Sequence, residues 1–320
     1  MSGGVGGPRR TWRRVDGIVL LDKPAGASST QALQRVRRLL QAAKAGHAGT
    51  LDPMATGMLP LCFGQATKAS GALLGSAKAY RASVRLGTAT DTGDAEGTIV
   101  QQCPVPVLDR PPVMGVLDGL RGPGTQVPPM HSALKHQGRP LYELARRGEV
   151  VPREPRSINI ARLELLRLDP DAIEFEVECS KGTYVRVLGE EIARRLGTIG
   201  HLTALRRLWV EPFEGEPMVT LEAVEHWAAG HVPVGPPAWL LPVDAAFRRL
   251  PRVDLSAQEA GHLRQGRVLE APPGTGPAER AAAYDPAGVF LGIVAVGPDG
   301  RLRAVRLFVP GGPDETAGSA

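Results

Sequence analysis

A single aspartate stands in a glycine-punctuated and otherwise largely apolar stretch at residues 46–59. Gly46 and Gly49 allow tight turns and the close approach of a ligand, and Pro53 biases the preceding Asp52 away from helical geometry. The stretch therefore predicts a rigid, presented carboxylate. A helix cap is the alternative, because Asp-Pro is also typical of a helix start at which the aspartate accepts backbone N–H bonds.

Further carboxylates lie in a loop rich in Thr, Asp and Gly at residues 88–97. Asp52 together with Asp91 or Asp94 would supply the two carboxylates of a glycoside hydrolase. The chain has only six Phe, four Tyr and four Trp, which is few for a cleft that stacks sugars. The hydrolase also leaves the basic segment 121–140 unexplained, so it stays an alternative.

Signals for a cofactor, a metal or a disulfide are missing from the sequence. No Gly-x-Gly-x-x-Gly follows a strand, no Gly-Lys-Ser/Thr phosphate loop is present, and no cluster of His, Cys and carboxylate has metal spacing. Cys62, Cys103 and Cys179 are far apart and form no Cys-x-x-Cys pair. No run of about 18 apolar residues and no signal-type apolar core occurs. We therefore expect a cytoplasmic protein with no cofactor, no metal and no membrane span.

The charge is modestly basic, with a formal net charge of +5 and a pI near 9.4. Arginines cluster within residues 9–14, and Arg and Lys cluster within residues 35–44. Such clusters suit a polyanionic partner, but an ordinary solvated surface explains them equally well. The 320 residues are enough for a catalytic body and a small appended domain.

Hydrophobic periodicity predicts a mixture of strands and helices. Residues 17–21 indicate a buried strand, Ser29 or Thr30 is the expected cap of the helix that follows, and residues 80–86 alternate like a strand. Further elements are expected as helices at 66–74, 113–120, 141–147 and 189–196 and as strands at 98–101, 158–168, 173–179, 281–284, 289–296 and 302–307.

Composition also divides the chain into segments. Residues 121–140 are too polar and too interrupted for a core element, so we expect an exposed insertion there. The Pro- and Gly-rich stretch 230–242 marks the approach to a domain boundary. The expected segments are a disordered basic tail at 1–15, a body at 16–250 with the insertion at about 121–150, a small, mostly β domain at 251–310 and a disordered tail at 311–320.

Seven sequence blocks, in order along most of the chain, resemble the bacterial tRNA pseudouridine synthase B family, which isomerises uridine-55 in the T arm of tRNA. The resemblance implies a mixed α/β body around a central antiparallel β-sheet, an insertion that grips the RNA arm, and a small RNA-binding domain of PUA type. It further implies the tRNA T stem-loop as partner, no obligatory protein partner and a monomer. The blocks are residues 17–29, 46–59, 78–81, 86–94, 127–135, 179–186 and 201–207.

The same resemblance implies roles for individual residues. Asp52 is the expected nucleophile, acting at ribose C1′, at uracil C6 or through a glycal, and Arg186 is the cation that keeps it ionised. Tyr80 is expected to stack on the flipped uracil and is the candidate for removing the C5 proton, while Tyr184 and Leu205 line the pocket. From periodicity alone, core packing explains Tyr80, Tyr184 and Leu205, and an exposed strand arginine explains Arg186.

Two more residues carry expectations of a different kind. His47 corresponds to a residue that occupies the space left by the extruded nucleotide, and Lys23, with Pro24, is expected to brace the active-site loop. Two alternatives for the whole chain remain. One is the related synthase of a guide-RNA particle, and the other is an RNA-binding and RNA-folding module without catalysis; folding activity could also accompany catalysis.

Overall fold

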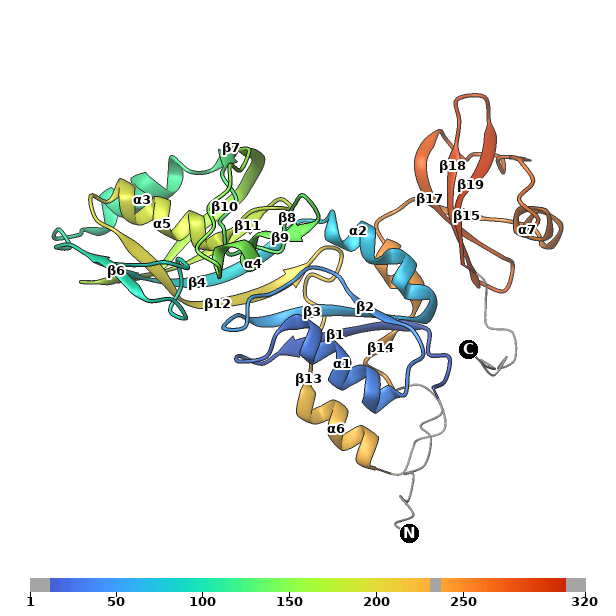
Figure 1. Ribbon diagram of the computed structural model, residues 1–320. Helices are drawn as coiled ribbons and strands as arrows, with labels where there is room; N and C mark the ends of the chain where they lie inside the picture. Colours follow the sequence, from blue (N-terminus) through green and yellow to red (C-terminus); the bar gives the residue numbers. More distant parts are fainter. Residues whose placement is uncertain (1–11, 231–236, 309–320) are drawn as a thin grey trace, which may run out of the picture.

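The computed structural model describes residues 12–230 and 237–308. A ten-stranded sheet forms the body, and a five-stranded sheet forms a separate C-terminal domain (Figure 1). The main path of the large sheet runs in the order β13-β1-β3-β12-β4-β11-β10-β7, with β14 paired to β1 and β2 to β3. Its strands pair antiparallel except for β1 with β13 and β3 with β12. The expected α+β class, a mixed body around a central antiparallel sheet with a small β domain, is confirmed.

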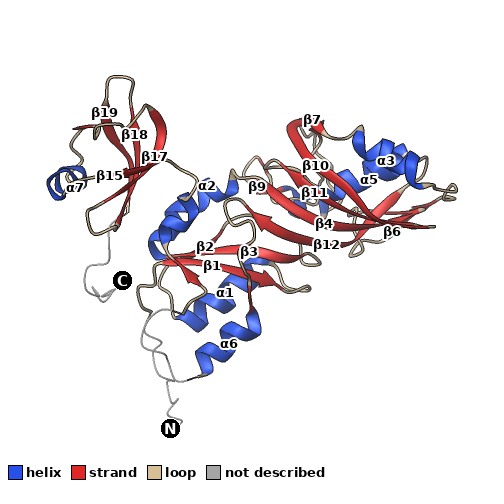
Figure 2. Cartoon of the chain, turned by 180° about the vertical axis from the view of Figure 1, so that it is seen from behind, coloured by secondary structure: helices blue, strands red, loops and turns tan. Residues whose placement is uncertain are grey.

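The N-terminal part of the sheet is covered by one amphipathic helix. Strand β1 (Gly17–Lys23) is buried almost throughout, and α1 (Ser29–Leu40) follows it. The cap of α1 is Ser28 rather than Ser29 or Thr30, because Ser28 and Gln31 form a reciprocal capping box. Helix α6 (Leu221–Ala229), which the sequence did not predict, packs beside α1 (Figures 1 and 2).

The central part of the sheet is built around β4 (Lys78–Leu86), which pairs with β11 (Ala172–Cys179) and β12 (Gly200–Val210). Residues alternate between the buried face and the other face along β4, as predicted. The strand β12 was not predicted, although its sequence block was identified. Helix α5 (Val185–Arg195) begins four residues before the predicted start at 189.

The expectation for residues 121–140 was wrong in its first part. Gly122–Gln126 form β7, an edge strand of the large sheet that pairs with β10 (Arg156–Asp169). Glycine and proline are compatible with this position because an edge strand needs partners on one side only. Beyond it, the chain leaves the sheet and forms the two-residue strands β8 (Lys135–His136) and β9 (Arg139–Pro140) before α4 (Leu141–Ala145).

The C-terminal sheet has the order β15-β17-β18-β19-β16 and its own apolar core. It contacts the body through an aromatic group in which Phe247 packs against Phe290 and Phe308. The Tyr284 hydroxyl donates to Asp244 at 3.1 Å across the same contact. Its elements are β15 (Arg252–Asp254), α7 (Ala257–Arg264), β16 (Leu269–Glu270), β17 (Ala278–Tyr284), β18 (Phe290–Val296) and β19 (Arg301–Leu307).

The remaining elements complete the body. Residues 1–11 of the predicted tail at 1–15, and the predicted tail at 311–320, lie outside the described residues. Residues 12–15 are described, and the tail was predicted too long there, because the Arg13 amide donates to the Gln41 carbonyl at 2.7 Å and its carbonyl accepts from the Ala43 amide at 2.9 Å. The remaining elements are β2 (Ala45–His47), β3 (Thr56–Phe63), η1 (Gly64–Ala69), α2 (Ser70–Leu74), β5 (Thr88–Thr90), β6 (Ile99–Gln102), α3 (Arg110–Asp118), β13 (Val219–Thr220), β14 (Leu240–Leu241) and η2 (Val243–Phe247).

Candidate active site

A cavity of about 310 Å³ opens beside Asp52. Its walls come from the loop at residues 49–52, from the adjacent strands β4 and β12, and from the segment that leads into α5. Sequence blocks that are far apart along the chain therefore meet at one place. Among the lining residues are Asp52, Tyr80, Tyr184, Arg186, Leu205 and Arg207.

The loop that carries Asp52 is held by the first strand and the first helix. The Nζ of Lys23 donates to three backbone carbonyls, including that of Pro53 at 3.2 Å. The Ser29 hydroxyl accepts from the Leu51 amide at 2.8 Å and donates to the Leu51 carbonyl at 3.1 Å. Both residues that flank Asp52 are thus fixed by hydrogen bonds, as a presented carboxylate requires.

Arg186 connects Asp52 with a second carboxylate. Its Nε lies 3.1 Å from Oδ2 of Asp52, and its Nη1 lies 3.4 Å from Oδ2 of Asp94. Further bonds go to the carbonyls of Thr92, at 2.9 Å, and His131, at 2.6 Å. The Arg186 side chain is only 6% exposed. It lies in the first turn of α5, so the alternative of an exposed strand arginine is wrong.

The surroundings of Asp52 act on its ionisation in opposite directions. Burial raises the pKa of Asp52, and the positive charge of Arg186 opposes this rise. About a third of the side chain, 34%, remains exposed at the cavity. The helix-cap alternative is also wrong, because residues 53–54 form a turn and β3 begins at Thr56. The carboxylate is therefore available to a ligand.

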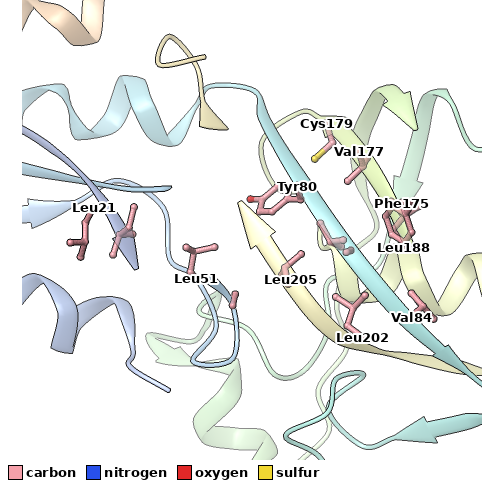
Figure 3. Close-up of a cluster of buried hydrophobic side chains, with 14 of the residues drawn as sticks. Leu21, Leu51, Tyr80, Val84, Phe175, Val177, Cys179, Leu188, Leu202 and Leu205 are labelled. Carbon is pink, nitrogen blue, oxygen red and sulfur yellow. The ribbon is translucent and has the colours of Figure 1, made fainter. Parts of the chain in front are cut away.

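Tyr80 and Leu205 form one apolar side of the cavity. Tyr80 lies on β4 and Leu205 on β12, and each is 8% exposed. Figure 3 shows them near each other, between Leu51 on one side and Val84 and Phe175 on the other, within the buried cluster of the body. Burial raises the pKa of Tyr80, which favours its neutral hydroxyl. The side chains of Tyr80 and Leu205 thus pack in the core and also line the cavity.

Tyr184 precedes α5, and the side chain of Gln126 holds its backbone. The Tyr184 amide donates to Oε1 of Gln126 at 2.7 Å, and Nε2 of Gln126 donates to the Tyr184 carbonyl at 3.1 Å. Gln126 is the last residue of β7 and is buried. The edge strand therefore fixes the entry to the helix that carries Arg186.

His47 and Lys23 are outside the lining of this cavity, as far as the described chain shows. His47 lies on β2, opposite Leu61 of β3. Burial, and then the charge of Arg207, lower the pKa of His47, so the ring is neutral near pH 7. Within residues 12–230 and 237–308 its buried Nδ1 has no hydrogen-bond partner. The structure brings together the other five predicted residues, Asp52, Tyr80, Tyr184, Arg186 and Leu205.

Four residues near the cavity had no predicted role in this site. Lys78 and Arg207 line it, Asp94 holds Arg186, and Gln126 holds Tyr184. Strand periodicity carries a signal for two of them: Lys78 is two residues from Tyr80, and Arg207 is two residues from Leu205. Residues two apart share one face of a strand, so both cations point to the same side as a predicted pocket residue. No comparable signal marks Asp94 or Gln126.

Neither a metal-binding cluster nor a membrane-spanning helix occurs among the described residues. In the described part of the chain, no group of three or more His, Cys, Asp or Glu side chains lies close enough to hold a metal ion. Within the same residues, none of the helices has the length and apolar character to cross a membrane.

Three family profiles match the chain. The N-terminal domain of TruB family pseudouridylate synthases matches residues 37–185, the tRNA pseudouridylate synthase B C-terminal domain matches 186–248, and the C-terminal domain of pseudouridine synthase II TruB matches 251–308. The tRNA pseudouridine synthase B of Aromatoleum aromaticum is 51% identical over 299 residues, 93% of this chain and 94% of the relative. That of Chromohalobacter salexigens is 48% identical over 300 residues, 94% of this chain and 96% of the relative.

Solved structures share the fold at much lower identity. A Cbf5-Nop10-Gar1 complex has a chain that is 22% identical, with a TM-score of 0.69, covering 92% of this chain and 84% of the other. An H/ACA RNP bound to a substrate RNA containing 2′-deoxyuridine has a chain that is 19% identical, with a TM-score of 0.68, covering 96% and 93%. The tRNA pseudouridine synthases B of Chromohalobacter salexigens and Aromatoleum aromaticum are 48% and 51% identical over 94% and 93% of this chain, which decides the family. Membership of this family excludes a glycoside hydrolase. The chain belongs to the tRNA pseudouridine synthase B family of pseudouridylate synthases and is an isomerase.

Proposed function

We propose that this protein converts uridine-55 in the T arm of tRNA to pseudouridine, with Asp52 as the nucleophile. The observation that carries this proposal is the contact of 3.1 Å between Asp52 and Arg186 at a cavity lined by Tyr80, Tyr184 and Leu205. The reaction breaks the bond between uracil N1 and ribose C1′, turns the base and rejoins it through C5. It transfers no electron, phosphoryl group or acyl group.

Asp52 has the chemistry that this reaction needs, because a carboxylate can attack and later leave. It must be ionised to do so, and burial works against ionisation. Arg186 offsets part of that cost, and Asp94 holds the other side of the guanidinium. The contacts are compatible with attack at C1′, with attack at C6 and with assistance to a glycal.

The base reaches Asp52 only after it has left its stack in the RNA loop. We propose that Tyr80 stacks on the extruded uracil and takes its C5 proton, while Tyr184 and Leu205 close the pocket around it. His47 would fill the space that the nucleotide leaves, and its neutral ring suits that role because it moves no proton. Lys23 acts through the loop that it braces.

The segment after β7 is the proposed grip on the RNA arm. It exposes Lys135, Arg139, Arg146 and Arg147, and Lys and Arg contacts to phosphate release counterions. We expect tRNA affinity to fall clearly as salt is raised; a flat response would contradict binding through this basic surface. The proposal also includes a cytoplasmic monomer without an obligatory protein partner.

Tritium release from a tRNA transcript labelled at uridine C5 tests the reaction. Wild type should release tritium, Asp52→Asn should not, and a transcript with cytidine at position 55 should give none. Asp171→Asn is the matched control, because Asp171 forms an exposed ion pair with Arg85. Release by neither wild type nor Asp52→Asn, with binding intact in both, would instead indicate an RNA-binding module.

A tRNA-folding activity is proposed beside the isomerisation. Asp52 is recessed, so the T arm must open around the base and close again afterwards. An Asp52→Asn variant that binds tRNA should therefore still accelerate the folding of a misfolded transcript. If this variant binds but gives no acceleration, the folding activity is ruled out and the isomerase is unaffected.

A further inference from the structure

Arg207 is a fully buried cation in the middle of the large sheet. Its side chain lies on β12 and the residue is 1% exposed. In the part of the chain that the structure describes, no carboxylate lies within ion-pair distance of its guanidinium. A buried charge without a counter-charge is destabilising, so this position needs an explanation.

The loop that carries Asp52 is built around this arginine. Arg207 Nε donates to the Met58 carbonyl at 2.6 Å, and Nη2 donates to the Gly49 carbonyl at 3.2 Å. A Cβ at Gly49 would lie 3.2 Å from Nη1, and a Cβ at Gly57 would lie 2.1 Å from the Arg207 carbonyl oxygen. Both glycines also have positive φ. Gly49 therefore leaves room for the Arg207 guanidinium, and Gly57 leaves room for the backbone of β12 at this position.

The basic groups around Arg207 supply no counter-charge. Lys78 on β4, Lys23 at the end of β1 and the His47 ring on β2 all feel its charge. Burial lowers the pKa of Lys78 and of Lys23 to about 8 each. Lys78 is itself occupied, since its Nζ donates to three carbonyls at the end of α2. None of these groups can neutralise the arginine.

Tyr80 is the acidic group that faces Arg207. The two residues are paired across β4 and β12, and directly opposed residues point to the same face of a sheet. Both line the cavity. Burial raises the pKa of Tyr80, and the charge of Arg207 acts against this rise. A side-chain hydrogen bond from Arg207 to Tyr80 acts in the same direction, so the guanidinium is already directed at the phenol oxygen.

We propose that Arg207 is a positioning residue that stabilises the negative charge on the Tyr80 oxygen when Tyr80 removes the C5 proton. The inference rests on the proposed function. The Tyr80 phenolate, formed by losing its proton to solvent, takes the proton from C5 of the rejoined base. The electron pair of that C–H bond becomes the C5=C6 bond, the N1=C6 π pair moves to N1, and N1 takes a proton from solvent.

The first test compares tRNA transcripts that carry hydrogen or deuterium at uridine C5. Arg207→Met should form pseudouridine about 10- to 100-fold more slowly than wild type, the range of a lost acid–base contribution. Proton removal should then limit the rate, so the variant should show a full primary isotope effect. An isotope effect near one would show that another step had slowed, as deformation of the Asp52 loop would cause, and would overturn the proposal.

The neighbouring arginine provides a matched control. Arg206 is the adjacent residue of β12, but it points away and forms a two-bond ion pair with Asp22 at 2.9 and 2.8 Å. Arg206→Met should therefore keep the wild-type rate. Absence of pseudouridine with wild type would contradict the proposed function itself, which is a different outcome from a selective loss in Arg207→Met.

Arg207→Lys provides a second test, which also serves if Arg207→Met does not fold. A lysine keeps the positive charge, but burial should lower the pKa of a lysine at this position, as burial lowers the pKa of Lys23 and Lys78. At pH 7 the variant should form product without a full isotope effect. At pH 9.5 it should slow relative to wild type and show the effect, because arginine keeps its charge there. A ratio of rates that does not change with pH would overturn the proposal.

Discussion

The two domains place their charges differently. The body buries Lys23, Lys78, Asp94, Arg186 and Arg207, each less than a tenth exposed. Within residues 252–308 no charged side chain is buried to that extent. The ion pairs there are at the surface, as in the contact of 2.8 Å between Arg303 and Asp299, which are 51% and 52% exposed.

The two domains therefore differ in what their charged residues can contribute. Exposed ion pairs contribute little to stability, and the C-terminal domain is held by its apolar core. Buried charges are costly unless they are paired and hydrogen-bonded. In the body Lys78, Arg186 and Arg207 line one cavity, Asp94 contacts Arg186, and Lys23 donates to the loop that carries Asp52. The region in which we propose the chemistry is therefore the one with the buried charges that are costly for stability. Four predictions test this contrast.

The largest effect is expected for Arg186→Met. Pseudouridine formation should fall by about 10²- to 10³-fold, because the charge that keeps Asp52 ionised is lost. The free energy of unfolding should fall by about 3–5 kcal/mol, because Asp94 is left buried without its partner. Single-turnover kinetics and urea unfolding measure the two effects. A variant that keeps wild-type activity would remove Arg186 from the mechanism.

The next effect concerns the two hydrogen bonds that fix Tyr184. Gln126→Leu should lower the rate constant about 10- to 100-fold through misplacement of the entry to α5. It should also cost about 1–3 kcal/mol of stability, because the backbone groups of Tyr184 lose their partner. Gln101→Leu, at an exposed position of β6, is the control and should change neither quantity. Equal effects of the two substitutions would contradict a positioning role.

A smaller effect is expected in the pH dependence of stability, through the buried Lys23. Burial lowers the pKa of Lys23 from 10.5 to about 8 in the folded protein. Between these values the unfolded chain holds more protons than the folded one, so stability rises with pH. Wild type should gain about 1–3 kcal/mol over Lys23→Met between pH 8 and 10.5 in urea titrations. Lys181→Met, at an exposed lysine, is the control, and a constant difference for Lys23→Met would contradict the burial of its charge.

The smallest effect is expected in the C-terminal domain. Arg303→Met removes an exposed ion pair, so Tm should not shift measurably in calorimetry and the rate on tRNA should change only through weaker binding. A clear loss of stability would break the contrast between the domains.

Much of the fold followed from local patterns in the sequence. Strand β4 alternates from Tyr80 onward and β1 is a short apolar run, and both were predicted close to their final bounds. The edge strand β7 was missed because Gly and Pro disfavour an interior strand, whereas its place at the edge was set by pairing with β10. The start of α5 was predicted four residues late, because no side chain caps it and Gln126 from β7 holds its entry.

The site divides in the same way. The presentation of Asp52 was readable from local glycine and proline spacing, because those residues act on their own backbone. The partners of Asp52 were known only by resemblance, and the links through Asp94 and Gln126 were not predicted at all. Each link joins residues more than 50 positions apart, and no local pattern encodes such a contact.

By itself, then, the sequence determined several strands, among them β1 and β4, the presented aspartate and, through its ordered blocks, the family. Only the tertiary structure decided that Arg207 lies against Tyr80, with no carboxylate among the described residues to pair with it, and that Gly49 leaves room for its guanidinium. The physical reason is that burial and counter-charge depend on what the other strands of the sheet bring to the same place.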